Sequence, residues 1–412
     1  MATASSRPRL RSIETIIVPD RKLGRALLLR DTQGVTDKHA VLPIELVPIV
    51  ARFTGSYTCE EIARQVATET GESVPVELVV EIASELEESL FVLGAPYTRA
   101  RALVEKAFAD ASVRPASHAG GAYHSEPKKL ADYIQKECFA KTDATSRAPN
   151  GGSRLVGLVA PHIDPWRGAR CYGEAYGVLA KSIPKDATTF ILFGTSHAPM
   201  REPFALCRKA FATPLGDLEA DLPAIDSIAA ACDFDPYADQ FNHKREHSLE
   251  FQAVFLRHLL GDRPAMIVPI LAGLGAQQST GESPNRARAV ERFLNAVRKV
   301  VDAQGAVVIA GADLAHVGPR FGDPRPFDEG ERRALDETDR ESLDHAARAD
   351  AEGFWKHVAG DLETRRVCGL APIYSLLRTV PRGATGHLRH YEQNVDPEEG
   401  SIVSHAALGF YA

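Results

Sequence analysis

The sequence predicts an α/β protein with a largely parallel sheet flanked by helices, together with a small additional domain at the N-terminus. Short apolar runs rich in β-branched residues alternate with helical stretches from residue 154 onward. The clearest runs are residues 155–160, 189–193 and 306–310, and each breaks into small residues or proline. Strands that alternate with helices form parallel sheets. Residues 11–110 lack this alternation and are expected to fold separately.

Size and composition narrow the possible functions. A chain of 412 residues with 44% hydrophobic and 25% charged residues is long enough for two globular domains. A net charge of −7 gives no reason to expect nucleic acid or a membrane surface as partner. The sequence has no apolar run long enough to span a membrane and no signal-peptide pattern at its start. Its six scattered cysteines indicate free thiols in a reducing compartment, so we expect a cytoplasmic protein.

The elements of the N-terminal part follow a recognisable order. Residues 1–10 are expected to be a disordered tail, and residues 15–31 two short strands across a turn. Helices are expected over 43–53, from Thr58, and over 76–90, followed by a strand at 91–93. Thr58 and Glu61 have the spacing of a capping box. This order is typical of a winged-helix-like unit covering residues 11–110.

Two stretches of this unit stand out, residues 54–62 (TGSYTCEEI) and Leu90-Phe91-Val92. Together they resemble PqqD-like peptide-recognition domains. Such domains bind the leader of a peptide that partner enzymes modify, so the resemblance implies a peptide or protein partner. The alternative is an interaction or oligomerisation module with another partner.

The domain over residues 111–412 is expected to hold alternating strands and helices. Residues 141–153 are polar and rich in Gly, Ser and Pro, which indicates a surface loop. The remaining elements are expected at the following positions: strands 155–160, 189–193, 265–271, 306–310, 386–392 and 402–411; helices 95–115, 128–139, 169–181, 246–260, 285–301, 331–346, 350–358 and 371–379.

Chemically active side chains follow three of these strands. His162 comes after Pro161, which ends the first strand; His197 closes a Gly-Thr-Ser-His turn after the second; Asp313 and His316 follow the third. Ligand-binding residues of parallel sheets lie just past the carboxyl ends of strands. One such histidine is more often a hydrogen-bonded structural residue, but two on separate strands favour a functional site.

Two further positions are candidates for the same site. Cys368 precedes the helix over 371–379, and a helix N-terminus lowers the pKa of a cysteine. Two histidines and a thiolate are an adequate metal-binding set, whereas the alternative for Cys368 is a buried, inert thiol. His247 begins a helix in the stretch EHSLE, which is not the HExxH pattern of metalloproteases. It could hydrogen-bond a ligand or a metal-binding residue.

Asp313 and His316 are three residues apart, and both would face one cleft if the segment turns helically. Their alternative is a helix-capping aspartate with a surface histidine. Motifs for dinucleotide binding, nucleotide hydrolysis and serine hydrolysis (GxGxxG, Walker A and GxSxG) are absent from the sequence.

Five short motifs occur in order along the second part of the chain: Ala160-Pro161-His162, Gly194-Thr195-Ser196-His197, residues 246–252 (EHSLEFQ), residues 313–318 (DLAHVG) and residues 368–373 (CGLAPI). In this order they resemble the Memo family, also called AmmeMemoRadiSam system protein B. An N-terminal HAGGAY segment at 118–123 extends the resemblance over residues 118–411.

The resemblance implies a fold similar to class III extradiol dioxygenases, with a metal at the carboxyl edge of the sheet. It implies that His162, His197 and Cys368 bind iron or copper, and that Asp313, His316 and His247 line the same pocket. A radical-SAM enzyme is the partner that the family name implies. The sequence departs from the usual family form at residues 163–166, IDPW, where many members have a small residue, glycine and tyrosine.

Three functions are consistent with these observations. The first is a non-haem iron or copper redox protein, in which Asp313, His316 and His247 provide acid–base or orienting groups. The second is a non-catalytic protein that binds a peptide or small ligand, or holds copper, in the same pocket without turnover. The third is an extradiol dioxygenase, which fits less well because those enzymes usually have a carboxylate at the position that Cys368 would occupy.

Overall fold

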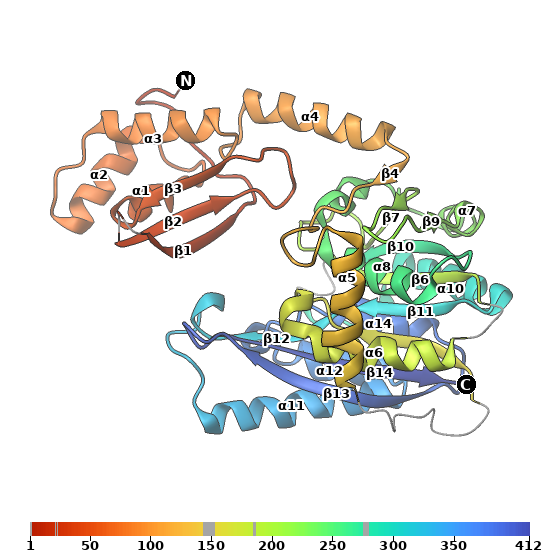
Figure 1. The fold of residues 1–412 in the computed structure, drawn as a ribbon. Helices are drawn as coiled ribbons and strands as arrows, with labels where there is room; N and C mark the ends of the chain where they lie inside the picture. The colour runs from red at the N-terminus through yellow and green to blue at the C-terminus, as the bar shows by residue number, and fades with distance from the viewer. Residues whose placement is uncertain (1, 21, 23, 143–152, 184–186, 275–279) are drawn as a thin grey trace. The chain divides into compact units, whose positions relative to one another are not determined.

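The computed structural model describes residues 2–20, 22, 24–142, 153–183, 187–274 and 280–412 (Figure 1). The chain divides into two compact units, Met1–Ala111 and Ser112–Ala412. Among the described residues, no helix has both the length and the apolar character that a membrane crossing requires. The polar loop expected over 141–153 lies almost entirely outside the described residues.

The first unit combines a small antiparallel sheet with helices. Its strands pair in the order β1-β2-β3, and residues from β2, α2 and α3 form its core. The capping box predicted at Thr58 and Glu61 is present at the start of α2. Whether the unit is winged-helix-like or PqqD-like stays a prediction. Its elements are β1 (Glu14–Asp20), β2 (Gly24–Arg30), β3 (His39–Pro43), the 3-10 turn η1 (Ile44–Leu46), α1 (Val47–Val50), α2 (Cys59–Thr70), α3 (Val76–Glu88) and α4 (Ala95–Asp110).

Two expectations for this unit are wrong. Residues 2–10 are ordered rather than a disordered tail, because their backbone bonds to the main chain of later residues: Leu10 N–H donates to Phe53 O, and Cys59 N–H donates to Ser6 O. Residues 91–93 do not form a strand. Within them only Val92 makes a bridge, to Leu10.

The second unit contains the large sheet and its helices. The elements before the middle of the unit are β4 (Val113–Arg114), α5 (Pro127–Tyr133), the π-turn η2 (Ile134–Cys138), η3 (Phe139–Lys141), β5 (Leu155–Ala160), α6 (Pro165–Ser182), β6 (Thr189–Thr195), β7 (Phe204–Leu206), β8 (Ala210–Phe211), β9 (Glu219–Ala220), α7 (Leu222–Ala229), η4 (Gln240–Arg245) and α8 (His247–Leu260). Those after it are β10 (Met266–Ala272), η5 (Pro284–Arg286), α10 (Arg288–Gln304), β11 (Val307–Gly311), β12 (Asp313–Val317), η6 (Pro319–Phe321), α11 (Glu329–Ala347), α12 (Ala351–Ala359), α13 (Leu362–Arg365), α14 (Leu370–Thr379), β13 (Thr385–Val395) and β14 (Ile402–Tyr411).

The large sheet is parallel at its centre and antiparallel at its margins. Its strand order is β12-β14-β5-β11-β6-β10-β7, with β13 paired to β14 and β9 to β10. The neighbours β5, β11, β6 and β10 are parallel, as the alternation of strands and helices predicts. The late strands β13 and β14 form an antiparallel hairpin that extends the sheet beyond β5.

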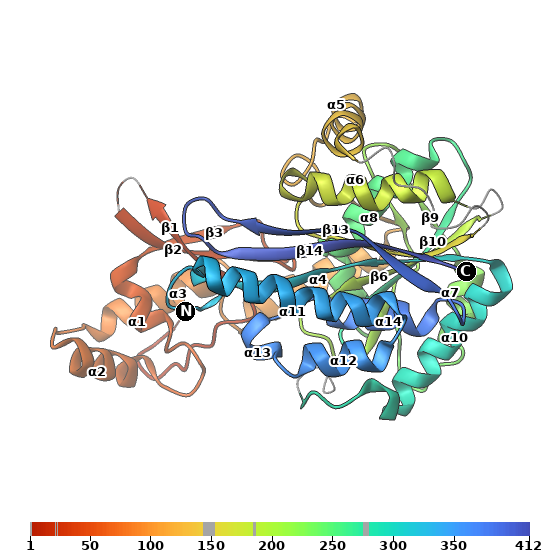
Figure 2. The same ribbon diagram turned by 90° about the horizontal axis from the view of Figure 1, so that it is seen from below.

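Helices cover both faces of the sheet, and the strands alternate between two apolar cores. On β11, Val308 and Ala310 pack with α10, α12 and α14, whereas Val307 and Ile309 pack with α6 and α8. Figure 2 shows α6 and α12 on opposite sides of the strands. Because both faces are covered, β5 and β6 are fully buried, which explains their continuous apolar sequences.

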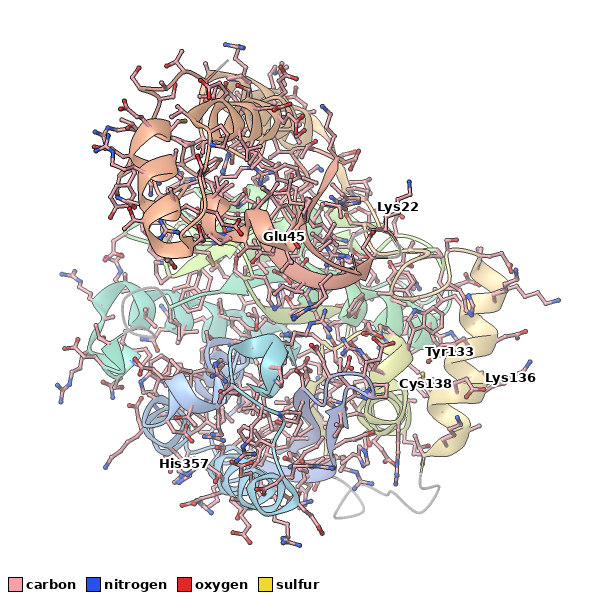
Figure 3. All side chains as sticks on the ribbon, turned by 90° about the vertical axis from the view of Figure 1, so that its left-hand side faces the viewer. Lys22, Glu45, Tyr133, Lys136, Cys138 and His357 are labelled. Atoms are coloured by element: carbon pink, nitrogen blue, oxygen red, sulfur yellow. The ribbon has the colours of Figure 1, made fainter. Side chains whose placement is uncertain are left out.

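The segment from α5 to η2 packs outside α6. Figure 3 shows Tyr133, Lys136 and Cys138 along it, with Lys136 at the surface. Cys138 is buried, and its carbonyl oxygen lies so close to Gly173 of α6 that a Cβ at this glycine would overlap it. The two helical segments can therefore approach closely only with glycine at this position.

Asp313 and His316 do not lie on a helical turn. They belong to strand β12, which pairs with β14 through an irregular register between these two residues. The extended conformation is favoured because β14 supplies partners for the backbone: Ala315 N–H donates to Ser404 Oγ, which lies on β14.

The end of β11 touches the first turn of α8. A Cβ at Gly311 would overlap the carbonyl oxygen of Ser248 and approach Gln252 Nε2.

We expect Gly311→Ala to destabilise the fold by about 1–3 kcal/mol, because the helix must move to relieve the overlap. Gly177→Ala is the matched control. It adds a methyl group inside α6 at ordinary contact distance from Thr142, and should be neutral or stabilise by up to about 1 kcal/mol. Urea unfolding of the two variants measures the difference, and equal stabilities would contradict the packing described.

Candidate metal centre

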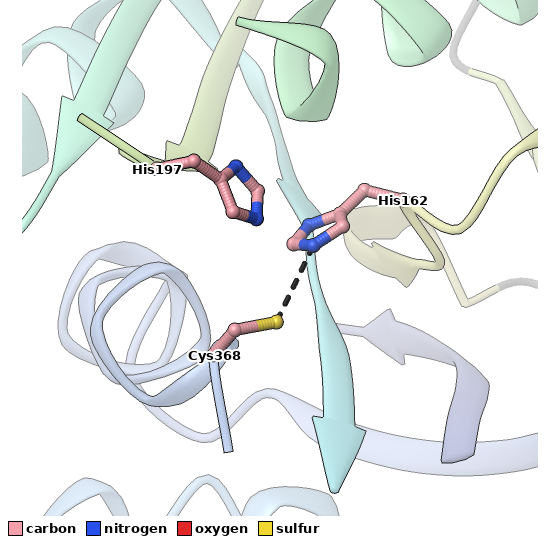
Figure 4. Close-up of side chains that lie close together, drawn as sticks. All are labelled: His162, His197 and Cys368. Atoms are coloured by element: carbon pink, nitrogen blue, oxygen red, sulfur yellow. Dashed lines mark hydrogen bonds between the residues drawn. The ribbon is translucent and has the colours of Figure 1, made fainter. Parts of the chain in front are cut away.

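Three residues far apart in the chain meet at the carboxyl edge of the sheet. His162 follows β5, His197 follows β6, and Cys368 precedes α14. One possible ligand atom from each lies within 4.8 Å of the other two. Figure 4 shows the two rings and the sulfur pointing toward one another. The three side chains therefore lie as close together as a shared metal site requires. Metal binding itself stays a prediction.

Burial and two hydrogen bonds fix the position of His162. Its side chain is only 2% exposed, its backbone N–H donates to Asp313 Oδ1 at 2.8 Å, and its Nδ1 lies 3.0 Å from Gly311 O. A carbonyl oxygen only accepts, so Nδ1 carries the hydrogen and Nε2 is the nitrogen available to a metal. Nε2 lies 3.3 Å from Cys368 Sγ.

His197 is oriented by a carboxylate that the sequence analysis attributed to helix electrostatics alone. Glu246 Oε2 accepts from the backbone N–H of His197 at 2.8 Å, and Glu246 Oε1 lies 2.9 Å from its Nδ1. Glu246 is buried, and the His197 side chain is 39% exposed. Although the surrounding protein disfavours a charged ring, Glu246 raises the pKa of His197. Nε2 is again left for a metal.

Cys368 is placed by the backbone of its neighbours. Thr195 Oγ1 donates to the carbonyl oxygen of Cys368 at 3.0 Å, and Gly369 N–H donates to Asp313 O at 3.0 Å. The loop before α14 is thereby fixed to the end of β6 and to the start of β12. Cys368 is half-buried, and its sulfur faces His162 rather than an apolar core, which disfavours the inert-thiol alternative.

The sulfur and the facing ring form an ion pair when no metal is bound. Burial favours the neutral thiol, but His162 and His316 lower the pKa of Cys368 to about 5. Burial likewise disfavours the charged ring, but Cys368 and Asp313 raise the pKa of His162 to about 9. At neutral pH the pair is a thiolate and an imidazolium. A metal that replaces the Nε2 proton would meet a thiolate already formed.

The three predicted pocket residues lie at different depths. Asp313 is fully buried and contacts His162 directly, with its Oδ2 3.7 Å from Nε2. The His247 ring stacks on His197 at 4.5 Å between centroids and meets His162 edge-on at 5.3 Å. His316 is farther out: its Nδ1 lies 3.2 Å from Leu314 O, and its ring packs edge-on against Phe321.

A second group, His197, Glu246 and His247, also has ligand atoms within 4.8 Å of one another. Glu246 already accepts from His197 and from Ser248 N–H at 3.0 Å, so we assign this carboxylate to orientation rather than to metal binding. Burial and the nearby His197 lower the pKa of His247 well below its ordinary value, so its ring is neutral.

The ion pair predicts how Cys368 reacts in metal-free protein. We expect its alkylation by iodoacetamide to increase as the pH rises through about 5, because the thiolate is the reactive form. In His162→Gln the cation is lost, and the midpoint should move toward the ordinary cysteine value. Cys232 is an internal control: burial raises its pKa to about 11, so it should stay unreactive from acid to neutral pH. Mass spectrometry after quenching measures both sites. A wild-type midpoint at the ordinary cysteine value would contradict the ion pair.

Comparison with known proteins identifies relatives of the second unit. The family described as Memo-like protein matches residues 114–409. A MEMO1 family protein of Aquifex aeolicus is 26% identical over 310 residues, 75% of this chain and 76% of that one. One from Thermus thermophilus is 30% identical over 267 residues, 65% of this chain and 73% of that one.

A solved structure of an uncharacterized Escherichia coli K12 protein aligns with 62% of this chain and 99% of its own, at 11% identity and a TM-score of 0.34. The family match covers most of the chain and all five motifs. The chain therefore belongs to the Memo family.

Proposed function

We propose that this chain is a metal-dependent redox protein that holds iron or copper on His162, His197 and Cys368. The observation that carries the proposal is the orientation of both rings. Gly311 O and Glu246 hold the two Nδ1 atoms, so both Nε2 atoms and the sulfur are left to converge. Ligating histidines normally donate their other N–H to a carbonyl or carboxylate in this way.

The donor set fits such an ion. Ligand atoms at about 2.0–2.3 Å from a metal lie roughly 3–4 Å from one another, and Cys368 Sγ lies 3.3 Å from His162 Nε2. Imidazole and thiolate donors suit copper, zinc and iron, whereas oxygen donors suit magnesium and calcium. When bound, iron or copper would supply one-electron redox chemistry.

The surrounding residues would keep the donors in place. Asp313 accepts the backbone N–H of His162, and Thr195 fixes the loop that carries Cys368. The neutral ring of His247 packs against His197, and its side chain is 31% exposed. His247 is therefore placed to contact a bound substrate, and Asp313 to preserve the geometry of the buried half of the site.

Metal content tests this proposal. After anaerobic reconstitution with Fe(II) or Cu(I), we expect about one ion per chain in the wild type and a large loss in Cys368→Ala and His197→Ala. Glu246→Gln should retain the ligands but weaken binding by about 10–100-fold. Cys232→Ala, which removes a half-buried thiol elsewhere, is the matched control and should bind normally. Elemental analysis and the sulfur-to-metal absorption band measure the outcome.

Metal content that is unchanged in Cys368→Ala would contradict the assignment of Cys368 as a metal ligand. A wild type that retains only zinc, or that binds iron or copper without consuming dioxygen in the presence of a reductant, would favour the non-catalytic alternative. Cleavage of catechols would instead indicate an extradiol-type dioxygenase.

We further propose that the first unit brings a peptide or protein partner, such as a radical-SAM enzyme, in the cytoplasm. The support is an antiparallel sheet whose outer strands carry exposed apolar side chains: Ile17 on β1 is 49% exposed and Val41 on β3 is 47% exposed. Edge strands of this kind accept an additional strand from a peptide.

Because a peptide strand would join one edge of the sheet, the partner proposal predicts that one of two variants, Ile17→Lys on β1 or Val41→Lys on β3, weakens binding of the full chain to a purified radical-SAM enzyme or its substrate peptide. Leu103→Lys is the control, since Leu103 is 72% exposed but lies on α4. Calorimetric titration measures the affinities. Equal affinities for all three variants would rule out binding through the sheet.

A further inference from the structure

A buried carboxylate on α8 holds a histidine that the proposed function does not use. Glu250 is fully buried and accepts hydrogen bonds from the Arg114 guanidinium and the Tyr123 hydroxyl. It also accepts the backbone N–H groups of Ser117 at 3.1 Å and His118 at 2.8 Å. In addition, its Oε2 lies 3.1 Å from Nδ1 of the His118 ring.

The ring is not needed to satisfy this carboxylate. A carboxylate has about four lone-pair directions, and Arg114, Tyr123 and the two backbone N–H groups already fill them. Burial alone would favour the neutral acid, but Arg114, the His118 ring and the Tyr123 hydroxyl lower the pKa of Glu250 to about 2. Glu250 is thus ionised at all working pH values. Its contact with His118 therefore serves to orient the ring.

The contact also fixes which ring nitrogen carries the proton. An ionised carboxylate can only accept, so Nδ1 of His118 is the N–H donor and Nε2 of the neutral ring has the free lone pair. Among the residues that the structure describes, none hydrogen-bonds this Nε2. A carboxylate that holds Nδ1 and leaves Nε2 available is the arrangement of an acid–base histidine.

His118 stands at the exposed side of the proposed metal centre. Its ring lies 5.6 Å from that of His247, which in turn lies 4.5 Å from His197 and 5.3 Å from His162. The side chains of His118, His247 and His197 are 28%, 31% and 39% exposed. They form a row of accessible imidazoles that leads from solvent to the buried His162.

We propose that His118 is the acid–base residue of this opening, which accepts through Nε2 the proton of a substrate O–H or N–H group bound against the centre. The bond from hydrogen to oxygen or nitrogen breaks, its electron pair stays on the substrate atom, and an Nε2–H bond forms. Glu250 stabilises the resulting imidazolium. The inference rests on the proposed function and adds to it a substrate class, protic molecules that must lose a proton as they are oxidised.

The charges around His118 determine the pH dependence. Glu250 and His247 face it from α8, Phe251 packs edge-on against it, and Arg114 of β4 lies behind the carboxylate. The ring of His247 is neutral. Only a ring with a free lone pair on Nε2 can accept a proton, so the rate of substrate oxidation should be lower in acid than at neutral pH.

The first test needs no metal. In ¹⁵N-labelled, metal-free full-length protein, long-range proton–nitrogen NMR correlations report the tautomer of each neutral histidine. We expect the Nδ1–H form for His118, with its signals assigned by their loss in His118→Gln. The opposite tautomer, or a ring whose Nε2 does not titrate, would overturn the proposal.

The second test uses ascorbate, whose enediol O–H supplies the proton, with dioxygen as the oxidant. Ascorbate and dioxygen give dehydroascorbate and hydrogen peroxide, so atoms and electrons balance. In the metal-loaded protein, His118→Ala should slow dioxygen consumption by about a hundredfold and flatten its pH profile, and added imidazole should restore both. His124→Ala is the matched control, because His124 belongs to the same segment but packs on Trp166.

Equal metal content in all proteins shows that the effect does not come from loss of the ion. Wild-type rates and an unchanged pH profile in His118→Ala would refute the assignment. If the wild type binds no metal, the proposed function fails, and the tautomer and titration of His118 decide the acid–base assignment by themselves.

Discussion

The register of three neighbouring parallel strands determines where the chemistry of this protein lies. Gly311 of β11 is level with Ala160 of β5 on one side and with Gly194 of β6 on the other. His162, Asp313 and His197 follow these positions by two or three residues and therefore emerge at the same height. Because side chains alternate between the faces of a strand, a slip of one residue in any pairing would move every side chain of that strand to the opposite face of the sheet. The packing of the two cores thus fixes the positions of the ligands as well.

The start of helix α8 links the end of β6 to the His197 ring through Glu246 and Ser248. Glu246 caps the helix by accepting Ser248 N–H, and the same carboxylate holds the ring of His197. Ser248 Oγ in turn donates to Thr195 O at the end of β6. Loss of a helix cap costs about 1 kcal/mol. A substitution at Glu246 would therefore disturb the helix start and the imidazole together, and a metal-binding effect there needs a parallel measurement of stability.

The sequence predicted the parts of this arrangement that depend on local pattern. Uninterrupted apolar runs identified β5, β6 and β11, and the rule for the ends of parallel strands placed His162 and His197 together. β12 was missed because its five residues take their partners from β14, almost ninety positions later in the chain. Glu250 was missed for the same kind of reason, since its partners Arg114 and His118 lie more than 130 residues away. Only the fold brings such groups together.

The two halves of the candidate centre differ in exposure, and this difference gives the direction from which a substrate arrives. His162 and Asp313 are buried, and Gly311 packs so closely against the first turn of α8 that a Cβ there would overlap the Ser248 carbonyl oxygen. His197 and His247 lie on the other side and keep about a third of their side-chain surface exposed. A metal bound by His162, His197 and Cys368 would therefore lie at the boundary between the buried and the exposed half of the site. The metal would then compensate the charge of the Cys368 thiolate in place of the His162 proton, and a substrate would arrive from the exposed side, past the neutral ring of His247.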